Sequence, residues 1–131
     1  MIEYPPEPLP GESRAEWDRR IAPWRMEMKR KLLTRRGWRC ERDGCQNPAE
    51  HLDECCLTRQ EMRGLSLEQR RIAFSEQNME LVCASCNVES AQDRDGAWHR
   101  QCARYGENAM KQWYSSLRLR APRHDWLPKE S

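Results

Sequence analysis

The chain has few residues from which to build a hydrophobic core. Of its 131 residues, 37% are hydrophobic and 34% are charged, with one Phe and three Tyr beside six Trp. A single domain with short extensions is expected at this length. Because the core of so small and polar a domain is thin, we expect it to depend on a cross-link or a bound metal for its stability.

Long apolar runs and a secretion signal are also missing. No run approaches the roughly 18 apolar residues of a membrane-spanning helix, and the first residues lack both the basic and the apolar region of a signal peptide. We therefore expect no membrane contact and a location in a reducing cytoplasm. In that compartment, closely spaced cysteines are metal ligands more often than disulfides.

The net charge of +2 conceals two basic segments. Residues 14–42 hold eleven Lys or Arg against four Asp or Glu, and residues 94–123 hold seven against two. Basic segments on either side of a more acidic centre suit a polyanionic partner such as nucleic acid. Either segment alone could equally be a solvent-exposed helix face.

Helices are expected on both sides of the cysteine-rich centre. Ser13 and Glu16 fit a capping box that begins a helix. Pro23 is expected to end or kink that helix, and a second helix can begin there and run to about Arg36. Apolar residues at spacings of three and four give these helices a buried stripe. The stripe consists of Trp17, Ile21, Trp24, Met28 and Leu32.

The remaining elements are shorter. A hairpin is expected over residues 38–54, turning at Asp43 and Gly44, because Asp-Gly is a strong turn signal. Residues 49–57 are expected to contain the strand that carries the polar site described below. Short helices are expected at 66–74, 88–93, 97–105 and 107–117.

These elements predict an α+β fold in one domain. The expected division is an extended proline-rich tail (1–13), one domain (14–120) made of N-terminal helices (14–36), a cysteine-rich core (37–95) and C-terminal helices (97–120), and an irregular tail (121–131).

Four cysteines form two close pairs. Cys40 and Cys45 have the spacing C-x4-C, Cys83 and Cys86 have the spacing C-x2-C, and 37 residues separate the pairs. Each pair can direct two thiolates at one ion, so that four sulfurs complete a tetrahedral zinc site. Such a closed shell is structural, and zinc can supply roughly 10 kcal/mol of folding free energy. The alternative is that Cys83 and Cys86 are small core residues.

Three cysteines lie outside these pairs. Adjacent side chains on a strand point to opposite faces, so Cys55 and Cys56 are not expected to join one cluster. Cys102 is a weaker alternative as a replacement zinc ligand. We interpret all three as structural thiols.

Polar residues near the cysteines could hydrolyse a phosphodiester bond. That reaction needs a divalent ion, a base that activates water, and groups that orient the base. Asp53 and Asn87 could supply the one or two oxygen ligands that Mg²⁺ takes from a protein. His51 and Glu54 are candidates for the base. Strand periodicity places His51 and Asp53 on one face, so a bulge would be needed to bring Glu54 into the same site.

The region between the first cysteine pair and Asn87 resembles the HNH endonuclease family. The sequence HLDE at residues 51–54 stands where that family has its catalytic dyad, and it is similar to the phage endonuclease VII branch, which has HLDH there. Asn78 lies five residues before Cys83, and Asn87 directly follows Cys86. The resemblance covers roughly residues 36–95.

This resemblance implies a fold and a set of roles. The fold would be a small ββα-metal core with a four-cysteine structural zinc and flanking helices. Asp53 and Asn87 would bind the catalytic ion, which would be Mg²⁺, Mn²⁺ or another divalent metal. Asn78 would fix a loop and orient the base.

The base departs from the family pattern, because the family's His falls on Glu54. Either Glu54 is the base, or His51 takes the role, or catalysis is weak or lost. A shifted register would instead make Glu50 and His51 the dyad. We expect both His51 and Glu54 in the site, and we expect His99 and His124, which have no partners at motif spacing, to be surface or packing residues.

The resemblance implies a metal-dependent DNA endonuclease that nicks or cuts both strands. By family analogy it would be encoded by a phage and act in DNA packaging, recombination or degradation in the host cytoplasm. Double-stranded DNA is the expected partner, with packaging or recombination proteins as further ones. Five arginines of the basic segments and the core are expected to contact phosphates: Arg35, Arg36, Arg39, Arg59 and Arg94.

Two other functions stay open. One is a catalytically silent zinc module that binds DNA or docks on a partner, which the altered base position favours. The other is a zinc-stabilised protein–protein adaptor that uses the Trp-rich helix; its binding would not depend on salt.

Overall fold

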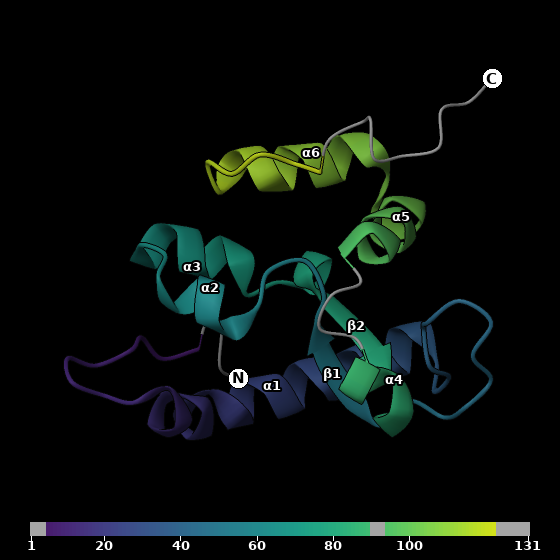
Figure 1. Cartoon of the computed structure of the whole chain (residues 1–131), viewed down its shortest axis with the longest axis horizontal. Helices are drawn as coiled ribbons and strands as arrows, with labels where there is room; N and C mark the ends of the chain where they lie inside the picture. The colour runs from purple at the N-terminus through teal and green to yellow at the C-terminus, as the bar shows by residue number, and fades with distance from the viewer. Residues whose placement is uncertain (1–4, 90–93, 123–131) are drawn as a thin grey trace.

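A computed structural model describes residues 5–89 and 94–122, with the backbone alone described at residues 88 and 89. Within these ranges the chain forms a mixed α+β structure (Figure 1). The elements are α1 (Arg14–Arg36), β1 (His51–Glu54), α2 (Arg59–Arg63), α3 (Leu67–Ala73), the 3-10 helix η1 (Glu76–Asn78), β2 (Met79–Val82), α4 (Ala84–Glu89), α5 (Arg94–Tyr105) and α6 (Glu107–Ser116).

Residues 14–36 form one continuous helix, so the predicted start of a second helix at Pro23 is wrong. α1 begins with the predicted capping box, in which Ser13 and Glu16 exchange hydrogen bonds. Pro23 lies inside the helix and points to solvent. The apolar stripe continues on both sides of it, and burial of that stripe offsets the roughly 3 kcal/mol that an interior proline costs. The predicted stripe is confirmed, with Met28 half-buried and its other four members buried.

The sheet has two short antiparallel strands, β1 and β2. Leu52 stands opposite Leu81, and Asp53 stands opposite Glu80. β1 is shorter than the predicted strand over 49–57. After Glu54, the N–H of Cys55 still donates to the backbone carbonyl of Asn78 at 2.9 Å. The ladder ends there, because the N–H groups of Cys56 and Leu57 donate to the side chain of Asn78 instead.

The predicted hairpin over 38–54 is reduced to one isolated bridge between Arg39 and Pro48. Pro48 has no N–H with which to extend a ladder, and β1 pairs with the distant β2 instead. The turn itself is where it was predicted. Gly44 has the positive φ of 74° that favours glycine, and the N–H of Cys45 donates to the carbonyl of Arg42 at 3.1 Å.

The core lies between α1, the sheet and the C-terminal helices. In Figure 1, α1 runs along one side of β1 and β2, while α5 and α6 lie on the opposite side. Trp17 and Trp24 pack edge-on against Phe74, and Trp98 packs against Tyr114. These aromatic pairs give the thin core much of its buried area.

Buried charges fasten α5 to the sheet. Glu80 is fully buried on β2, and its carboxylate accepts hydrogen bonds from Nε and Nη2 of Arg100 at 2.7 and 3.0 Å. Arg104 lies 3.2 Å from the same carboxylate. Arg100 also reaches Asp43 in the turn between the first two cysteines. A fully buried carboxylate requires partners of this kind, so this network fixes α5, β2 and that turn together.

Most of the shorter helices match their predictions. The helix over 66–74 is confirmed as α3 with its capping box, and α6 closely matches 107–117. α5 begins three residues earlier than predicted. The helix predicted at 88–93 is instead α4, which begins before Cys86, and residues 90–93 lie outside the described ranges.

The N-terminal tail packs along the body of the domain. Residues 5–12 form no helix or strand, and the indole N–H of Trp17 donates to the carbonyl of Pro6 at 2.9 Å. The predicted irregular C-terminal tail, with His124, lies mostly outside the described residues. In the described part of the chain, no helix has both the length and the apolar character that crossing a membrane requires.

Candidate metal centre and polar groove

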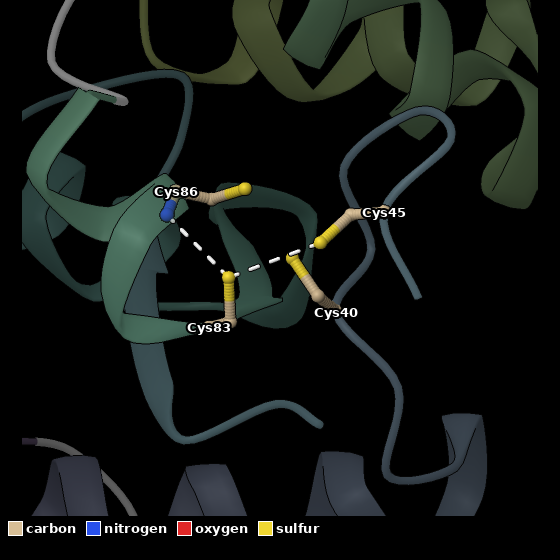
Figure 2. A group of neighbouring side chains, drawn as sticks. All are labelled: Cys40, Cys45, Cys83 and Cys86. Carbon is tan, nitrogen blue, oxygen red and sulfur yellow. Dashed lines mark hydrogen bonds between the residues drawn. The ribbon is translucent and has the colours of Figure 1, made fainter. Parts of the chain in front are cut away.

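The four paired cysteines converge on one point. Their sulfur atoms all lie within 4.8 Å of one another, and the Sγ atoms of Cys45 and Cys83 are 3.9 Å apart. Figure 2 shows two side chains arriving from the loop after α1 and two from the junction of β2 and α4. Four thiols in this arrangement can hold a metal ion such as zinc. All seven cysteines belong to the described residues, and none is in a disulfide.

Backbone hydrogen bonds bring the two pairs together. The N–H of Cys40 donates to the carbonyl of Asn47 at 2.8 Å, which closes the loop that carries the first pair. The N–H of Glu41 donates to the carbonyl of Leu81 at 2.8 Å, and the N–H of Leu81 donates back to the Glu41 carboxylate at 2.7 Å. The first pair is therefore fixed against β2, which leads directly into the second pair.

The thiols of the second pair differ in acidity. Hydrogen bonds from the backbone N–H of Cys86 and from the side-chain amide of Asn47 lower the pKa of Cys83 to about 6. Burial and the neighbouring thiols raise the pKa of Cys86 to about 12. Cys83 is thus prepared as a thiolate, whereas Cys86 needs a cation before it will lose its proton. This pattern fits a metal centre.

The cysteine cluster is separate from the main core. Cys40, Cys83 and Val82 form their own small buried group, with Cys45 and Cys86 half-buried beside it. Cys102, the alternative zinc ligand, lies on α5 and packs against the main core instead. The described residues therefore favour the two predicted pairs as the ligand set.

A groove of about 500 Å³ lies beside β1. It is lined by α1, by β1 and the residues on either side of it, by α4, and by the start of α5. Four of the five predicted catalytic residues line it: His51, Asp53, Glu54 and Asn87. Basic side chains from three helices line it as well: Arg14, Arg25, Lys29, Arg59 and Arg94.

The three polar residues of β1 have different surroundings. His51 is exposed, and its imidazole has no hydrogen-bond or ion-pair partner among the described residues. Asp53 is half-buried and accepts a hydrogen bond from Nη2 of Arg42 at 2.8 Å. Glu50, from the alternative register, is exposed and also lines the groove.

Glu54 is the most enclosed of the polar residues in the groove. Its carboxylate accepts a hydrogen bond from Nε of Arg25 at 2.7 Å and lies 3.5 Å from Nε of Arg59. Arg25 also donates to the carbonyl of Leu52 at 2.7 Å. Glu54 therefore reaches the groove without the bulge that period-two geometry demanded, because α1 and α2 both lie against its face of the strand.

The two predicted asparagines occupy different environments. Asn87 is exposed on α4 and lines the groove. Asn78 is fully buried away from it. The Asn78 side chain accepts from the N–H groups of Cys56 and Leu57 at 2.8 and 2.7 Å, and donates to the Leu57 carbonyl at 2.9 Å. Asn78 thus holds the loop after β1, and it makes no hydrogen bond to His51 or Glu54.

The five predicted phosphate-binding arginines are dispersed. Arg59 and Arg94 line the groove, and Arg39 is exposed on the loop after α1. Arg35 pairs with Glu76 on the surface. Arg36 is 11% exposed and binds Glu41, the Tyr105 hydroxyl and two backbone carbonyls. These contacts within the protein indicate that Arg36 has a structural role and does not bind phosphate.

Sequence reasoning missed Arg25 and Lys29 as individual groove residues. With Ala22 and Met26 they repeat at spacings of three and four along α1, on the face next to the buried stripe. This spacing can be read from the sequence. The sequence does not show that these residues line a groove, because that depends on β1 lying against this face of α1.

No protein-family model, no curated protein and no solved structure matches this chain. Its function is therefore inferred from the chemistry of the cysteine cluster and the groove.

Proposed function

We propose that this chain is a divalent-metal-dependent DNA endonuclease of the HNH type with a structural zinc on its four paired cysteines. The observation that carries the proposal is the meeting of His51, Asp53 and Asn87 in one groove with five basic side chains. Asp53 and Asn87 are 34 residues apart in the sequence. An imidazole, oxygen ligands and cationic side chains are the groups that metal-assisted phosphodiester hydrolysis requires.

The order of elements supports a ββα-metal core. The antiparallel strands β1 and β2 are followed at once by α4, which begins at the second cysteine pair and carries Asn87. The segment that connects the two strands contains α2 and α3 and is longer than the turn of a simple hairpin. Zinc on the cysteine cluster would tie the loop before β1 to the β2–α4 junction, and so would hold β1 and α4 on either side of the groove.

Asp53 and Asn87 would hold the catalytic ion, Mg²⁺, Mn²⁺ or a related divalent metal. Their carboxylate and amide oxygens suit a hard cation that keeps most of its water ligands. When bound, the ion would stabilise negative charge on the phosphate. Arg42 contacts Asp53 at 2.8 Å and keeps this carboxylate in place.

His51 is the general base in this proposal. It is exposed in the groove and has no partner among the described residues, so its ring can accept a proton from water. Glu54 has the opposite surroundings, because two guanidinium groups already bind its carboxylate. We assign Glu54 to positioning Arg25 and Arg59, which would contact the phosphates of the substrate.

The substrate in this proposal is double-stranded DNA, bound mainly through its phosphates. Lys29, Arg14 and Arg94 add to the basic lining of the groove. Contacts of this kind position a duplex without reading its sequence. A phage origin, a place in packaging, recombination or degradation, and protein partners from those processes remain part of the proposal through the family resemblance alone.

The test is cleavage of supercoiled plasmid by zinc-loaded protein. Reactions would contain EDTA, or Mg²⁺, Mn²⁺ or Ni²⁺ in excess over EDTA, with wild type, His51→Ala and Asp53→Ala compared. His99→Ala is the matched control, because His99 is an exposed histidine on α5 outside the groove. Nicking that needs a divalent ion and survives only in wild type and His99→Ala would support the proposal.

A second candidate is a catalytically silent zinc module that binds DNA. The ion pair between Asp53 and Arg42 favours it, since a guanidinium already satisfies a carboxylate that would otherwise bind the ion. In that case no metal would give cleavage, and gel retention of DNA would persist. A protein–protein adaptor would show neither cleavage nor salt-dependent retention.

A further inference from the structure

Cys55 and Cys56 are brought together where the chain leaves β1. Neighbouring residues on a regular strand would point to opposite faces. Both cysteines follow the end of the strand at Glu54, however, and the Asn78 side chain captures the N–H of Cys56. The bend turns the two thiols toward each other, with their Sγ atoms 3.8 Å apart. The expectation that they point apart is therefore wrong, although neither joins the four-cysteine cluster.

The pair is reachable although each residue is buried. Cys55 is 8% exposed and Cys56 is 4% exposed. Both line the groove of about 500 Å³ beside β1. Cys56 also lines a second, more apolar cavity of about 830 Å³ between α2 and the end of α6. A small molecule can thus approach Cys55 from the groove and Cys56 from either cavity.

The spacing of the sulfurs suits one atom bonded to both. A centre about 2.3 Å from each sulfur, the usual metal–thiolate distance, would see a separation of 3.8 Å at an angle of about 110°. A disulfide fits less well, because adjacent Cα atoms are about 3.8 Å apart and disulfides normally span about 4.4 to 6.8 Å. Two adjacent thiols select soft centres, even with the hydroxyl of Tyr114 beside Cys56.

We propose that Cys55 and Cys56 form a vicinal dithiol site for a trivalent arsenical, a soft electrophile that bridges two thiols. Each thiol loses its proton and forms one sulfur–arsenic bond. The oxygen of the arsenoxide leaves with both protons as water, and the arsenic stays trivalent. The site is separate from the zinc ligands and does not depend on the proposed nuclease activity.

Intact-mass measurement of zinc-loaded, full-length protein treated with phenylarsine oxide tests the site. We expect one phenylarsine group per chain, added with loss of one water and without loss of zinc. Excess monothiol should leave this adduct in place, and 2,3-dimercaptopropanol should remove it, because only a dithiol can replace both bonds. Cys55→Ser and Cys56→Ser should each abolish the stable adduct. Cys102→Ser is the matched control and should retain it.

Two results would overturn the proposal. One is a wild-type protein that takes up no arsenical, or takes it up only as zinc is released, which would place the reaction at the four-cysteine cluster. The other is an adduct that survives in Cys55→Ser or Cys56→Ser. If either variant fails to fold, the wild-type adduct can be located by fragmenting the tryptic peptide 43–59 in the mass spectrometer. An adduct that bridges residues 55 and 56 supports the site. An adduct on Cys45 alone contradicts it.

Discussion

The carboxylate of Glu54 is joined to Nε of Arg25 by a hydrogen bond of 2.7 Å that crosses from β1 to α1. The Glu54 side chain is 8% exposed, and Arg59 approaches it from α2. Glu54 therefore holds two cationic side chains in the groove. His51, three residues earlier on the same strand, has no such partner among the described residues. In the proposed mechanism, this difference makes Glu54 a positioning residue and His51 the base.

Substitution of these two residues should have unequal effects on plasmid nicking. His51→Ala should lower the rate by about 10²- to 10⁴-fold, the usual contribution of a general base. Glu54→Gln keeps a hydrogen-bond acceptor beside Arg25, so the rate should fall less than tenfold. The rates would be measured with Mn²⁺ at matched DNA occupancy. The reverse order of effects would make Glu54 the base.

The groove should bind DNA through counterion release. Lys29 lines it and has no ion-pair partner among the described residues. Lys29→Ala should reduce the slope of log K against log salt concentration by about 0.9, the loss of one phosphate contact. Fluorescence anisotropy with a labelled duplex between 50 and 200 mM salt would measure this, with Lys111→Ala on α6 as the control. An unchanged slope for Lys29→Ala would place the DNA elsewhere.

Local signals in the sequence predicted local structure well. The capping boxes at Ser13 and Ser66 and the turn at Gly44 are where their residue types place them, because each depends on contacts within three or four residues. The cysteine spacing likewise predicted the cluster. Pro23 was misjudged because its local cost is outweighed by packing on either side of it, which no short window of sequence contains.

The parts of the site that could not be predicted depend on long-range pairing. β1 pairs with β2 rather than with the residues before it, and only this pairing explains why Asn78 is buried. The contact between Arg25 and Glu54 joins residues 29 positions apart on different elements. The sequence predicted that Glu54 lies near the site, but it could not show that Arg25 pairs with it, because that contact depends on α1 lying against β1.

The metal on the four-cysteine cluster should be necessary for folding. Cys86→Ser removes one of the four sulfurs and leaves three thiols crowded together without a complete shell. Structural zinc can supply about 10 kcal/mol, which exceeds the stability of many domains of this size, so this variant should be largely unfolded at 25 °C. Circular dichroism and zinc content would be measured together. Cys102→Ser should keep one zinc per chain and a cooperative unfolding transition.

Glu76 should make stability depend on pH on the acid side. Burial tends to raise the pKa of Glu76, but hydrogen bonds from Tyr105 and Arg35 outweigh it, and the pKa is lowered overall. Because the pKa of Glu76 is lower in the folded state than in the unfolded state, the ionised carboxylate stabilises the fold at pH values above the unfolded-state pKa of about 4.3. This contribution is lost as the pH falls through the folded-state pKa. The ionised group should contribute about 1 kcal/mol at pH 7, since the pair is partly exposed.

Urea unfolding of wild type and Glu76→Gln at several pH values would measure this contribution. The difference in free energy of unfolding should be constant from pH 7 to about 5 and should shrink below about pH 4. Glu68→Gln, at an exposed glutamate on α3, is the control and should leave the curve unchanged. A difference between wild type and Glu76→Gln that persists at pH 2 would mean that packing, and not ionisation, is what the substitution disturbs.

The two asparagines of the motif should separate stability from catalysis. Asn78 satisfies two backbone N–H groups and one carbonyl inside the protein. Asn78→Ala would leave these groups buried without partners and should cost about 2 to 4 kcal/mol of unfolding free energy. Asn87 is exposed in the groove, so Asn87→Ala should change stability by less than about 0.5 kcal/mol.

Catalysis should respond in the opposite way. Asn87→Ala removes a proposed ligand of the divalent ion, so nicking at saturating DNA should require a higher concentration of Mn²⁺, and excess Mn²⁺ should restore part of the rate. The fraction of Asn78→Ala that remains folded should nick with the wild-type dependence on Mn²⁺, because the Asn78 side chain binds the backbone after β1 and none of the proposed catalytic side chains. A shifted Mn²⁺ dependence in Asn78→Ala would show that the loop after β1 positions the ion-binding carboxylate. An unshifted dependence in Asn87→Ala would remove this residue from the ligand set and leave Asp53 as the one proposed protein ligand.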